Sequence, residues 1–560
     1  MFAKKLEFVT ELYKRSYKTL FASTVIVVST MVLARIFGLW KYRVLTSYYT
    51  GAERDLFFAA FRIPDLVFDV LILGSLSACY IPLISKVQAE DGEDVQRVHS
   101  FTLTLIVLFL LTWAVIVGVI FPLRYGLFQL VVPGFSPQNQ RLAADLSMYL
   151  LLIQVPLLIV GNVYASYMQS RKQFLVPGLA QIAYTVGIVF SIIVGARIWG
   201  LRAALIGAGI GAFLYCLSLL PGMKLFTKGT RILPWNHPLI TTFVVMFIPR
   251  LASMAIVQFD ATIDVALASL KGVGAMSAFS LAQSLQIIPV TLIGVALGQA
   301  VLPFFVEYAH KKNYHELMRN VTRLLLLVFF VTMPFVVFFT TLRIPVTRLI
   351  FGGEKFDWDS TVSTAYTLSA FAISMPFHTA YYIIVRAFFS LDDTKTPLVV
   401  GFYATVFNSL LSVLFIVILK LPVWYLAVSF SISIALQVMT LYVMLVWRID
   451  GIKLKDVLPR FVLIALIALV TAVLVWLLRK LLDGLVFDTT RTIQVLWLTA
   501  TCVFMGLAVY GYAAWAFIPD EFDQLINLFK RLRVVKATID RYTKLFYVNK
   551  TLTTMDEKHE

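Results

Sequence analysis

Charged residues and cysteines are scarce in this chain, and each shortage excludes a class of protein. Only 14% of the 560 residues are charged, against roughly a quarter in a typical soluble domain. Together with a mean hydropathy of +0.85, this excludes a water-soluble globular protein. The three cysteines, Cys79, Cys216 and Cys502, lie far apart in apolar stretches, which excludes a metal cluster of closely spaced thiolates. The sequence also lacks a phosphate-cradling Gly-Lys loop, a metal-spaced His pair and a nucleophile elbow. We therefore expect no enzyme and no resident cofactor.

Apolar residues make up 60% of the chain, and they gather in segments long enough to cross a membrane. A transmembrane helix needs about 20 apolar residues. The segments of this kind are 20–38, 56–84, 102–123, 143–169, 174–196, 202–222, 238–264, 275–306, 322–346, 361–390, 397–419, 422–447, 461–478 and 492–518. We therefore predict an all-α polytopic membrane protein with about 14 transmembrane helices.

The basic residues predict how the chain is oriented. Of the 48 Lys and Arg residues, 29 fall on the side of the two termini and 15 on the other side. Because Lys and Arg collect in cytoplasmic loops, we expect both termini in the cytoplasm. The net charge of +17 then faces anionic lipid, and we expect no nucleic-acid partner. The ends of the chain, 1–19 and 519–560, are predicted to be amphipathic and cytoplasmic. The basic tail is expected to lie on the inner leaflet, and binding of a partner protein is the alternative.

Two pairs of segments about 220 residues apart resemble each other. LSACYIP at 76–82 matches LGQAVLP at 297–303, and SRKQFLVP at 170–177 matches SLDDTKTP at 390–397. Turn residues recur by chance in many proteins, but both pairs fall at equivalent points in the order of the spans. We therefore predict two parallel six-helix lobes, 20–222 and 238–447, followed by two helices within 461–518. Such repeats fit a transporter whose lobes rock about a central site.

Ionisable residues within the predicted spans are costly there, and they usually face a cavity or a partner. One interpretation is that internal salt bridges merely neutralise them, and the other is that they line a cationic, water-filled cavity between the lobes. Their occurrence at equivalent helices favours the cavity. His378, alone in its span, is expected to be a hydrogen-bonded core residue. The clusters are Arg35 with Lys41 and Arg43, then Asp55, Arg62, Asp65 and Asp69, and then Arg250, Asp260 and Asp264.

Several motifs occur together in one order along the chain. They are ARIFGL at 34–39, DLFFAAFRIP at 55–64, PGF at 133–135, IGVALGQAVLP at 293–303, LIFGGEKF at 349–356 and DTKTP at 393–397. With them the chain resembles the MurJ (MviN) lipid II flippase family of the MOP exporter superfamily over about residues 20–515. The resemblance implies two lobes around a central cavity in the bacterial cytoplasmic (inner) membrane. It also implies a role in peptidoglycan and cell wall biogenesis, in which lipid II moves from the inner to the outer leaflet by alternating access.

The resemblance implies substrate-binding residues position by position. The arginine of the family's first helix matches Arg35 and the next cation matches Lys41, while the acidic and basic residues of the second helix match Asp55 and Arg62. We add Asp65 from the same helix face as a further candidate.

The chain also departs from the family at three positions. It has Phe68 and Ser284 where many members have arginines, and Leu73 where they have an acidic residue. A pyrophosphate prefers forked guanidinium donors. We therefore expect Arg250 to supply part of the missing positive charge and to bind substrate.

The resemblance further implies a sodium site in the second lobe, at about Asp264, Asn408, Ser412 and Ser431. A carboxylate and an amide oxygen suit a hard cation. The family's second carboxylate falls at Ser412, so a weak site and no site both stay open. Coupling to the membrane potential is the alternative.

Three functions are compatible with these observations. The first is a lipid II flippase, whose partners are a lipid-linked saccharide and membrane lipids. The second is a transporter of another lipid-linked oligosaccharide or of small amphiphiles. The third is a non-transporting scaffold that binds cell-wall synthesis proteins. The charge of the cavity separates the first two, since organic cations need an acidic cavity and a pyrophosphate needs a basic one.

Overall fold

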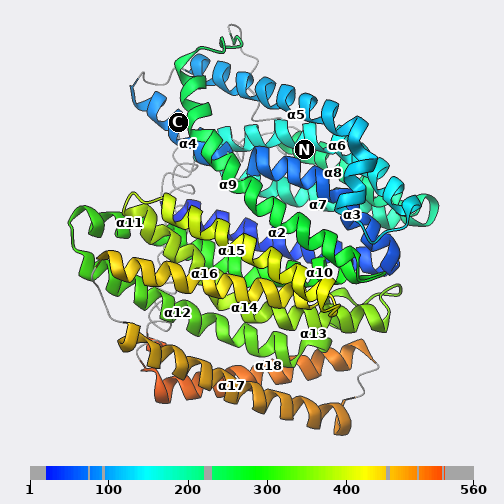
Figure 1. The fold of residues 1–560 in the computed structure, drawn as a ribbon, viewed down its shortest axis with the longest axis vertical. Coiled ribbons are helices and arrows are strands. Elements are labelled where there is room, and N and C mark those ends of the chain that lie inside the picture. The colour runs from blue at the N-terminus through cyan, green and yellow to red at the C-terminus, as the bar shows by residue number, and fades with distance from the viewer. Residues whose placement is uncertain are drawn as a thin grey trace, which may run out of the picture. The chain divides into compact units, whose positions relative to one another are not determined.

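The computed structural model describes residues 20–73, 76–90, 95–219, 230–449, 454–487, 491–519 and 522–523, which form helices and their connecting turns (Figure 1). The predicted amphipathic segment 1–19 and nearly all of 519–560 lie outside these residues. The helices are α2 (Leu20–Tyr48), α3 (Gly51–Phe68), η1 (Asp69–Leu73), α4 (Leu76–Glu90), α5 (Val95–Val131), α6 (Pro137–Ser170), α7 (Leu175–Trp199), α8 (Arg202–Leu219), α9 (Pro238–Ser269), α10 (Ala275–Pro289), η4 (Val290–Val295), α11 (Ala296–His310), α12 (Tyr314–Thr341), α13 (Arg343–Phe351), α14 (Trp358–Ser390), α15 (Lys395–Val413), η5 (Leu414–Ile418), α16 (Tyr425–Ile449), α17 (Leu454–Leu485) and α18 (Thr492–Phe517).

Among the described residues, 12 helices are long and apolar enough to cross a membrane. They coincide with the third to the fourteenth predicted spans, which confirms an all-α polytopic membrane protein. The first two predicted spans correspond to α2 and to the segment from α3 to α4, in which residues 74–75 are not described. The count of fourteen therefore stays a prediction.

The predicted internal repeat is visible in the order and spacing of the helices. The second long helix of each half is interrupted by a π-helical turn, and these turns, η1 and η4, begin 221 residues apart. The two predicted tight turns each contain a residue in the left-handed region, Lys172 with φ 62° and Asp392 with φ 57°. Each turn is followed by a helix whose third residue is proline, Pro177 in α7 and Pro397 in α15. The missing N–H costs little there, because the first turn of a helix leaves these groups unpaired.

The described residues form two compact units. The described residues of one unit lie within 1–302 and 342–442, and those of the other lie within 303–341 and 443–560. Helix α12, which the sequence repeat assigns to the second lobe, thus belongs to the unit that contains α17 and α18. In that unit the Oη of Tyr510 donates to the carbonyl of Phe330 at 2.9 Å, and the two rings stack.

In the larger unit, α2 packs on α7, which packs closely on α8 (Figure 1). A Cβ atom on Gly187 would stand 2.5 Å from the Cα of Gly211, so only glycine allows these backbones to approach. Ser191 donates its Oγ proton to the carbonyl of Ala203 at 2.7 Å across the same interface. Small residues at such contacts are typical of membrane helices, and the α7–α8 pair supports the helix that carries Arg35 and Lys41.

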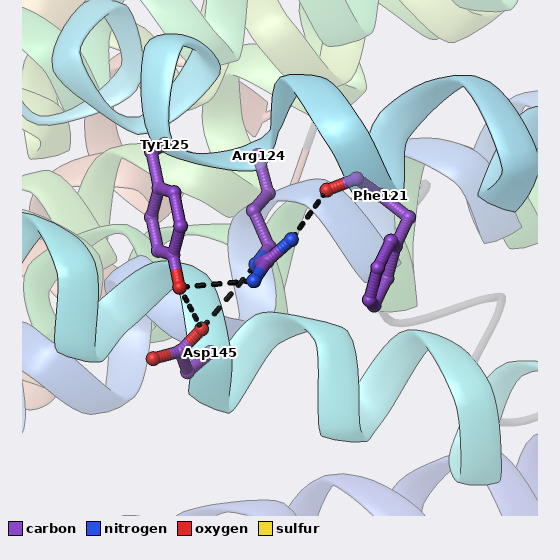
Figure 2. Close-up of polar contacts among 4 residues, drawn as sticks. All are labelled: Phe121, Arg124, Tyr125 and Asp145. Atoms are coloured by element: carbon purple, nitrogen blue, oxygen red, sulfur yellow. Dashed lines mark hydrogen bonds and ion pairs between the residues drawn. The ribbon is translucent and has the colours of Figure 1, made fainter.

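Figure 2 shows how the ends of α5 and α6 are joined around Arg124. Its guanidinium donates to the carbonyl of Phe121 at 2.7 Å and to the Oη of Tyr125 at 2.9 Å, and it pairs with Asp145 at 3.4 Å. The rings of Phe121 and Tyr125 lie 4.5 and 4.2 Å from it. Arg124 is therefore a cation whose partners are all local, and it stabilises one helix pair.

Helix α14 begins with a side-chain cap that titrates. The Oδ1 of Asp357 accepts a hydrogen bond from the N–H of Ser360 at 2.8 Å. Hydrogen bonds from the Ser360 side chain and backbone lower the pKa of Asp357 below its usual value of 3.8. Since the folded-state pKa is the lower one, this stabilisation is present above the ordinary pKa and is lost as the pH falls through the folded-state pKa.

We expect Asp357→Ala to lower the free energy of unfolding by about 1 kcal/mol at neutral pH, and Asp357→Asn to cost less, because asparagine also caps helices. The measurement is the denaturation midpoint in detergent at pH 7 and at about pH 3. The cost of the alanine variant should shrink at the lower pH. An equal cost at both pH values would contradict a role for the ionised carboxylate.

Candidate functional site

Arg35 and Lys41 line one cavity of about 220 Å³ between α2 and α10. Both side chains are half-buried, and the Nζ of Lys41 lies 4.4 Å from the centre of the Tyr42 ring. Ser284 lines the same cavity from α10, and its Oγ donates to the carbonyl of Leu281 at 2.6 Å. Among the lining residues, Arg35 and Lys41 therefore carry the positive charge. We call this cavity the basic pocket.

Arg62 is held by α9 rather than by the acidic residues of its own helix. Its Nε donates to the Oγ1 of Thr262 at 3.0 Å, and its Nη2 donates to the carbonyl and to the Oε1 of Gln258 at 2.6 and 2.7 Å. The Nε2 of Gln258 in turn donates to the Oδ2 of Asp69 at 2.7 Å. A neutral glutamine thus connects Arg62 to Asp69. The hydrogen bonds of Arg62 therefore connect α3 to α9.

Asp65 and Phe68 occupy the same segment of α3. Asp65 is half-buried and lies within range of the charges of Arg62 and Lys41. Phe68, also half-buried at the end of α3, contributes an aromatic ring and no positive charge. Of the acidic residues on this helix, Asp65 is therefore the one on which the charge of the basic pocket acts.

Asp55, expected to contact substrate, serves instead as a cap on another helix. Its side chain is only 3% exposed. Its Oδ2 accepts from the N–H of Gly274 at 2.6 Å, and its Oδ1 accepts from the N–H of Ser277 at 2.7 Å. These donors lie at the start of α10, where unpaired N–H groups and the helix dipole favour a negative charge. We therefore assign Asp55 to the contact between α3 and α10.

Arg54, beside it, is a fully buried cation that was missed by the sequence analysis. It is 0% exposed. Its Nη1 donates to the carbonyls of Tyr49 and Lys355 at 2.7 and 3.0 Å, and its Nη2 donates to the Oγ of Ser360 at 2.8 Å. These bonds connect α3 to the start of α14. The signal in the sequence is weak, because Arg54 lies at the end of a predicted connection, where a cation is expected to be solvated.

The end of α2 makes similar contacts with α13. Arg43 donates to the carbonyls of Arg348 and Leu349 at 3.1 and 3.2 Å, and Thr46 donates its Oγ1 proton to the carbonyl of Phe351 at 2.6 Å. Cations and hydroxyls are favoured at the carbonyl end of a helix. We call Arg43, Thr46, Arg54 and Asp55 with these partners the closed joint. It fastens the first half of the chain to the second at the α2–α3 turn.

Arg250 is exposed on α9, directly after Pro249. Its charge reaches Cys79 on α4 and Arg386 on α14. Arg386 is half-buried, and Tyr382 lies within range of both Arg386 and Arg35. Arg250 does not line the basic pocket itself. Arg386 is thus a further half-buried cation on α14 whose charge interacts with that of Arg250, although its isolated position in the sequence did not mark it as a site residue.

The predicted cation site is a polar cluster between α9 and α15. Asp260 and Asp264 lie one turn apart on α9. The Oδ1 of Asp260 accepts from the Nδ2 of Asn408 and from the Oγ of Ser409, both at 3.1 Å. The Oδ1 of Asp264 accepts from the Oγ of Ser412 at 3.2 Å. Asp264 is 4% exposed and Asn408 is 2% exposed, so the site is buried among oxygen atoms.

The membership of this cluster differs from the prediction at two positions. Ser431 donates its Oγ proton to the carbonyl of Ala370 at 2.8 Å, and Ser429 takes its place by sharing a hydrogen bond of 2.7 Å with Ser412. The second carboxylate, which the resemblance places at Ser412, is supplied one helix away by Asp260. Two carboxylates, an amide and hydroxyl groups fit the ligand preferences of Na⁺-like hard cations.

His378 lies at the edge of this region. The Nε2 of Gln286 donates to the Nδ1 of His378 at 3.0 Å and to the Oγ of Ser374 at 3.1 Å. The imidazole also stacks on Tyr382, with centroids 5.9 Å apart. His378 is therefore hydrogen-bonded and packed between helices, as predicted.

Known relatives and structures support the same fold and family. The chain is 26% identical to the probable lipid II flippase MurJ of Borreliella burgdorferi over 79% of this chain and 86% of the relative. It is 23% identical to the lipid II flippase MurJ of Burkholderia cenocepacia over 71% of this chain and 78% of the relative. A solved structure of a lipid II flippase MurJ in an inward closed conformation matches with a TM-score of 0.73 and 21% identity, over 89% of this chain and 99% of the other.

A second solved structure shares the architecture at lower similarity. The inward-facing conformation of a multidrug resistance MATE family transporter of the MOP superfamily matches with a TM-score of 0.66 and 13% identity, over 76% of this chain and 98% of that one. The model of the family described as "Lipid II flippase MurJ" matches residues 46–494. Because that match spans most of the sequence and includes Ser284 of the basic pocket, Arg54 and Asp55 of the closed joint and the α9–α15 cluster, this chain belongs to the MurJ lipid II flippase family.

Proposed function

We propose that this protein is a flippase that moves the undecaprenyl-pyrophosphate-linked peptidoglycan precursor, lipid II, from the inner to the outer leaflet of the bacterial cytoplasmic membrane. The observation that carries the proposal is the basic pocket, where Arg35 and Lys41 meet in one cavity between α2 and α10. A forked guanidinium beside an ammonium suits the oxygens of a diphosphate. The lipid tail remains in the bilayer while the head group crosses between the lobes.

The cations near the pocket compensate for the two missing arginines. Ser284 leaves open the part of the cavity that a longer side chain would fill. Arg386 and Arg250 lie on α14 and α9, and the charges of Arg35 and Arg386 both act on Tyr382. The positive charge is thereby spread over three helices, and the pocket retains the sign that a diphosphate requires.

The position of the closed joint indicates on which side of the membrane this conformation is closed. Cytoplasmic termini, proposed from the distribution of Lys and Arg, place the α2–α3 turn outside the cell. The hydrogen bonds of Arg54 and Asp55 then close the outer side. Transport requires that these bonds break while the lobes rock.

The experiment that tests this function is complementation of a bacterium depleted of its own flippase. Lipid II in the outer leaflet is labelled in intact cells by a reagent that does not cross the membrane. We expect this chain to restore both growth and outer-leaflet labelling. Normal expression with no labelled lipid II would reject lipid II as the cargo.

We further propose that the cluster of Asp260, Asp264, Asn408 and Ser412 binds sodium as a coupling ion, while the membrane potential is the alternative driving force. The buried carboxylate of Asp264, the half-buried carboxylate of Asp260 and the amide oxygen of Asn408 support a cation of this kind. Asp260 supplies the second charge that Ser412 lacks. A bound ion stabilises the folded state by mass action, by about 2.7 kcal/mol at a concentration a hundred times its Kd.

Asp264→Asn should therefore remove a sodium-dependent stabilisation. We expect the purified wild-type protein to unfold at a higher temperature in NaCl than in KCl of equal ionic strength, and the variant to unfold at one temperature in both. Asp145→Asn is the matched control, because Asp145 is an exposed carboxylate paired with Arg124. A wild-type protein that is insensitive to the cation would contradict the sodium site.

Arg250→Ala is expected to reduce outer-leaflet labelling as much as Arg35→Ala does, by roughly 100-fold, because hydrogen bonds to charged groups are worth about 1.5–3 kcal/mol. Arg250→Lys retains the charge without the fork, so the fraction of transport it keeps measures how much the geometry of the donors matters. Wild-type labelling by the alanine variant would remove Arg250 from the substrate path.

A further inference from the structure

A second cavity of about 480 Å³ lies among α9, α14, α15 and α16. It shares no lining residue with the basic pocket. Its volume is within the range of about 300–1,000 Å³ that small-molecule sites occupy. Most of its wall is apolar or aromatic, with Val257, Leu398, Phe402 and Phe430 among its members. We call it the α9–α16 cavity.

One end of the cavity is negatively charged and rich in hydrogen-bond acceptors. Asp260 and Asn408 both line it. The Oδ1 of Asn408 is buried and has no hydrogen-bond partner among the described residues, although its Nδ2 donates to Asp260. An unpaired buried acceptor costs about 1–3 kcal/mol. Neither lysine nor arginine is among the lining residues, so no basic side chain of the cavity wall neutralises Asp260.

The aromatic wall is preformed. His378 stacks on Tyr382 and meets the edge of Phe430, with ring centroids 5.9 and 5.5 Å apart. Because the Nδ1 of His378 accepts from Gln286, the imidazole is fixed in position. A ligand therefore finds a rigid aromatic surface rather than one that must be ordered on binding.

The other end of the cavity is lined by apolar side chains that are exposed on membrane-spanning helices. Leu398 is 41% exposed and Phe402 is 47% exposed. Leu398 and Asn408 are ten residues apart on α15, which corresponds to about 15 Å along the helix. A ligand that fills the cavity is therefore elongated, with an apolar part that lies at this exposed end.

We propose that the α9–α16 cavity binds an amphiphilic primary ammonium ion. Its NH₃⁺ group lies between Asp260 and the Oδ1 of Asn408, and its hydrocarbon chain runs past Phe402 to Leu398. An ammonium group has three donors and no acceptor, so it supplies a positive charge beside Asp260 and a hydrogen bond to the unpaired Oδ1 of Asn408. The aromatic faces add cation–π attraction. The ammonium group uses oxygens of Asp260 and Asn408 that the proposed sodium ion also uses, so the two cations exclude each other at this end of the cavity.

The test uses the purified full-length protein in lipid nanodiscs, with decylammonium as the probe and decanol as its uncharged match. We expect saturable binding of decylammonium above that of protein-free nanodiscs, and binding of decanol weaker by about 30-fold or more. Asp260→Asn should weaken decylammonium binding by about 30-fold or more, because it removes one partner of a buried charge pair. Decanol binding should not change in that variant.

A second variant tests the site sterically. Gly401 lines the cavity. A Cβ atom added there would meet only the Nε2 of Gln437, at 3.4 Å. The variant Gly401→Leu therefore fills the cavity without altering its charge. Gly118→Leu is the matched control. Gly118 lies on α5, which does not line this cavity, and a Cβ atom there meets nothing within 4 Å. We expect the first to abolish decylammonium binding and the second to leave it unchanged, as should Arg35→Ala. The absence of saturable binding to the wild-type protein, or wild-type binding by both Asp260→Asn and Gly401→Leu, would overturn the proposal.

Discussion

Replacing Arg35 with alanine is expected to abolish complementation and to lower outer-leaflet labelling of lipid II roughly 100-fold, with normal amounts of protein in the membrane. Arg35 lines the basic pocket, where Ser284 on the facing wall brings no charge. The alanine variant leaves Lys41 as the remaining cation of the pocket. An ammonium alone cannot make the paired, parallel hydrogen bonds that a guanidinium makes with a diphosphate.

Arg35→Lys and Arg124→Ala complete this experiment. The lysine variant should retain only part of the activity, because it keeps the charge and loses the fork. Arg124 is a matched control, because it is another arginine near a helix end whose donors are used by Phe121, Tyr125 and Asp145 (Figure 2). Its alanine variant should transport normally. Full complementation by Arg35→Ala would show that the basic pocket is not where the pyrophosphate binds.

Arg54→Met is expected to destabilise the closed joint by about 3–5 kcal/mol, because a buried cation is removed and its partners are left unpaired. The carbonyls of Tyr49 and Lys355 and the hydroxyl of Ser360 would lose a donor. Since these bonds connect α3 to the start of α14, their loss favours conformations in which the joint is open.

The measurement is the reaction of a cysteine placed at Ser277, which is 1% exposed, with an impermeant maleimide added outside the cell. The background lacks the three native cysteines. Arg54→Met should raise the labelling rate about tenfold or more, which corresponds to a shift of about 1.4 kcal/mol, whereas Arg124→Met should not change it. Unchanged labelling together with an unchanged denaturation midpoint would mean that Arg54 does not hold the joint closed.

The parts of the fold that depend on local pattern were predictable from the sequence. Runs of apolar residues located the spans, and the motifs 220 residues apart located the repeat, because each turn needs the same few residues wherever it occurs. The common cavity of Arg35 and Lys41 also follows, since both lie on one short stretch of α2. These features need no knowledge of which helices touch.

The contacts that cross between distant helices were not predictable. Asp55 caps α10 through N–H groups at Gly274 and Ser277, and backbone donors of this kind leave no trace in the sequence. Gln258, a neutral residue, connects Arg62 to Asp69, so counting charges could not identify it. The second carboxylate of the cation cluster is Asp260 on α9. A position-by-position comparison with the family places it at Ser412 on α15 instead.

The two π-helical turns occupy equivalent positions in the two halves of the chain. A π-helical turn accommodates one residue more than the α-helix around it. η1 and η4 lie at the same place in the two halves, 221 residues apart, so a single insertion that was later copied explains both. In each half, the second long helix therefore contains one residue more than a regular α-helix of the same length.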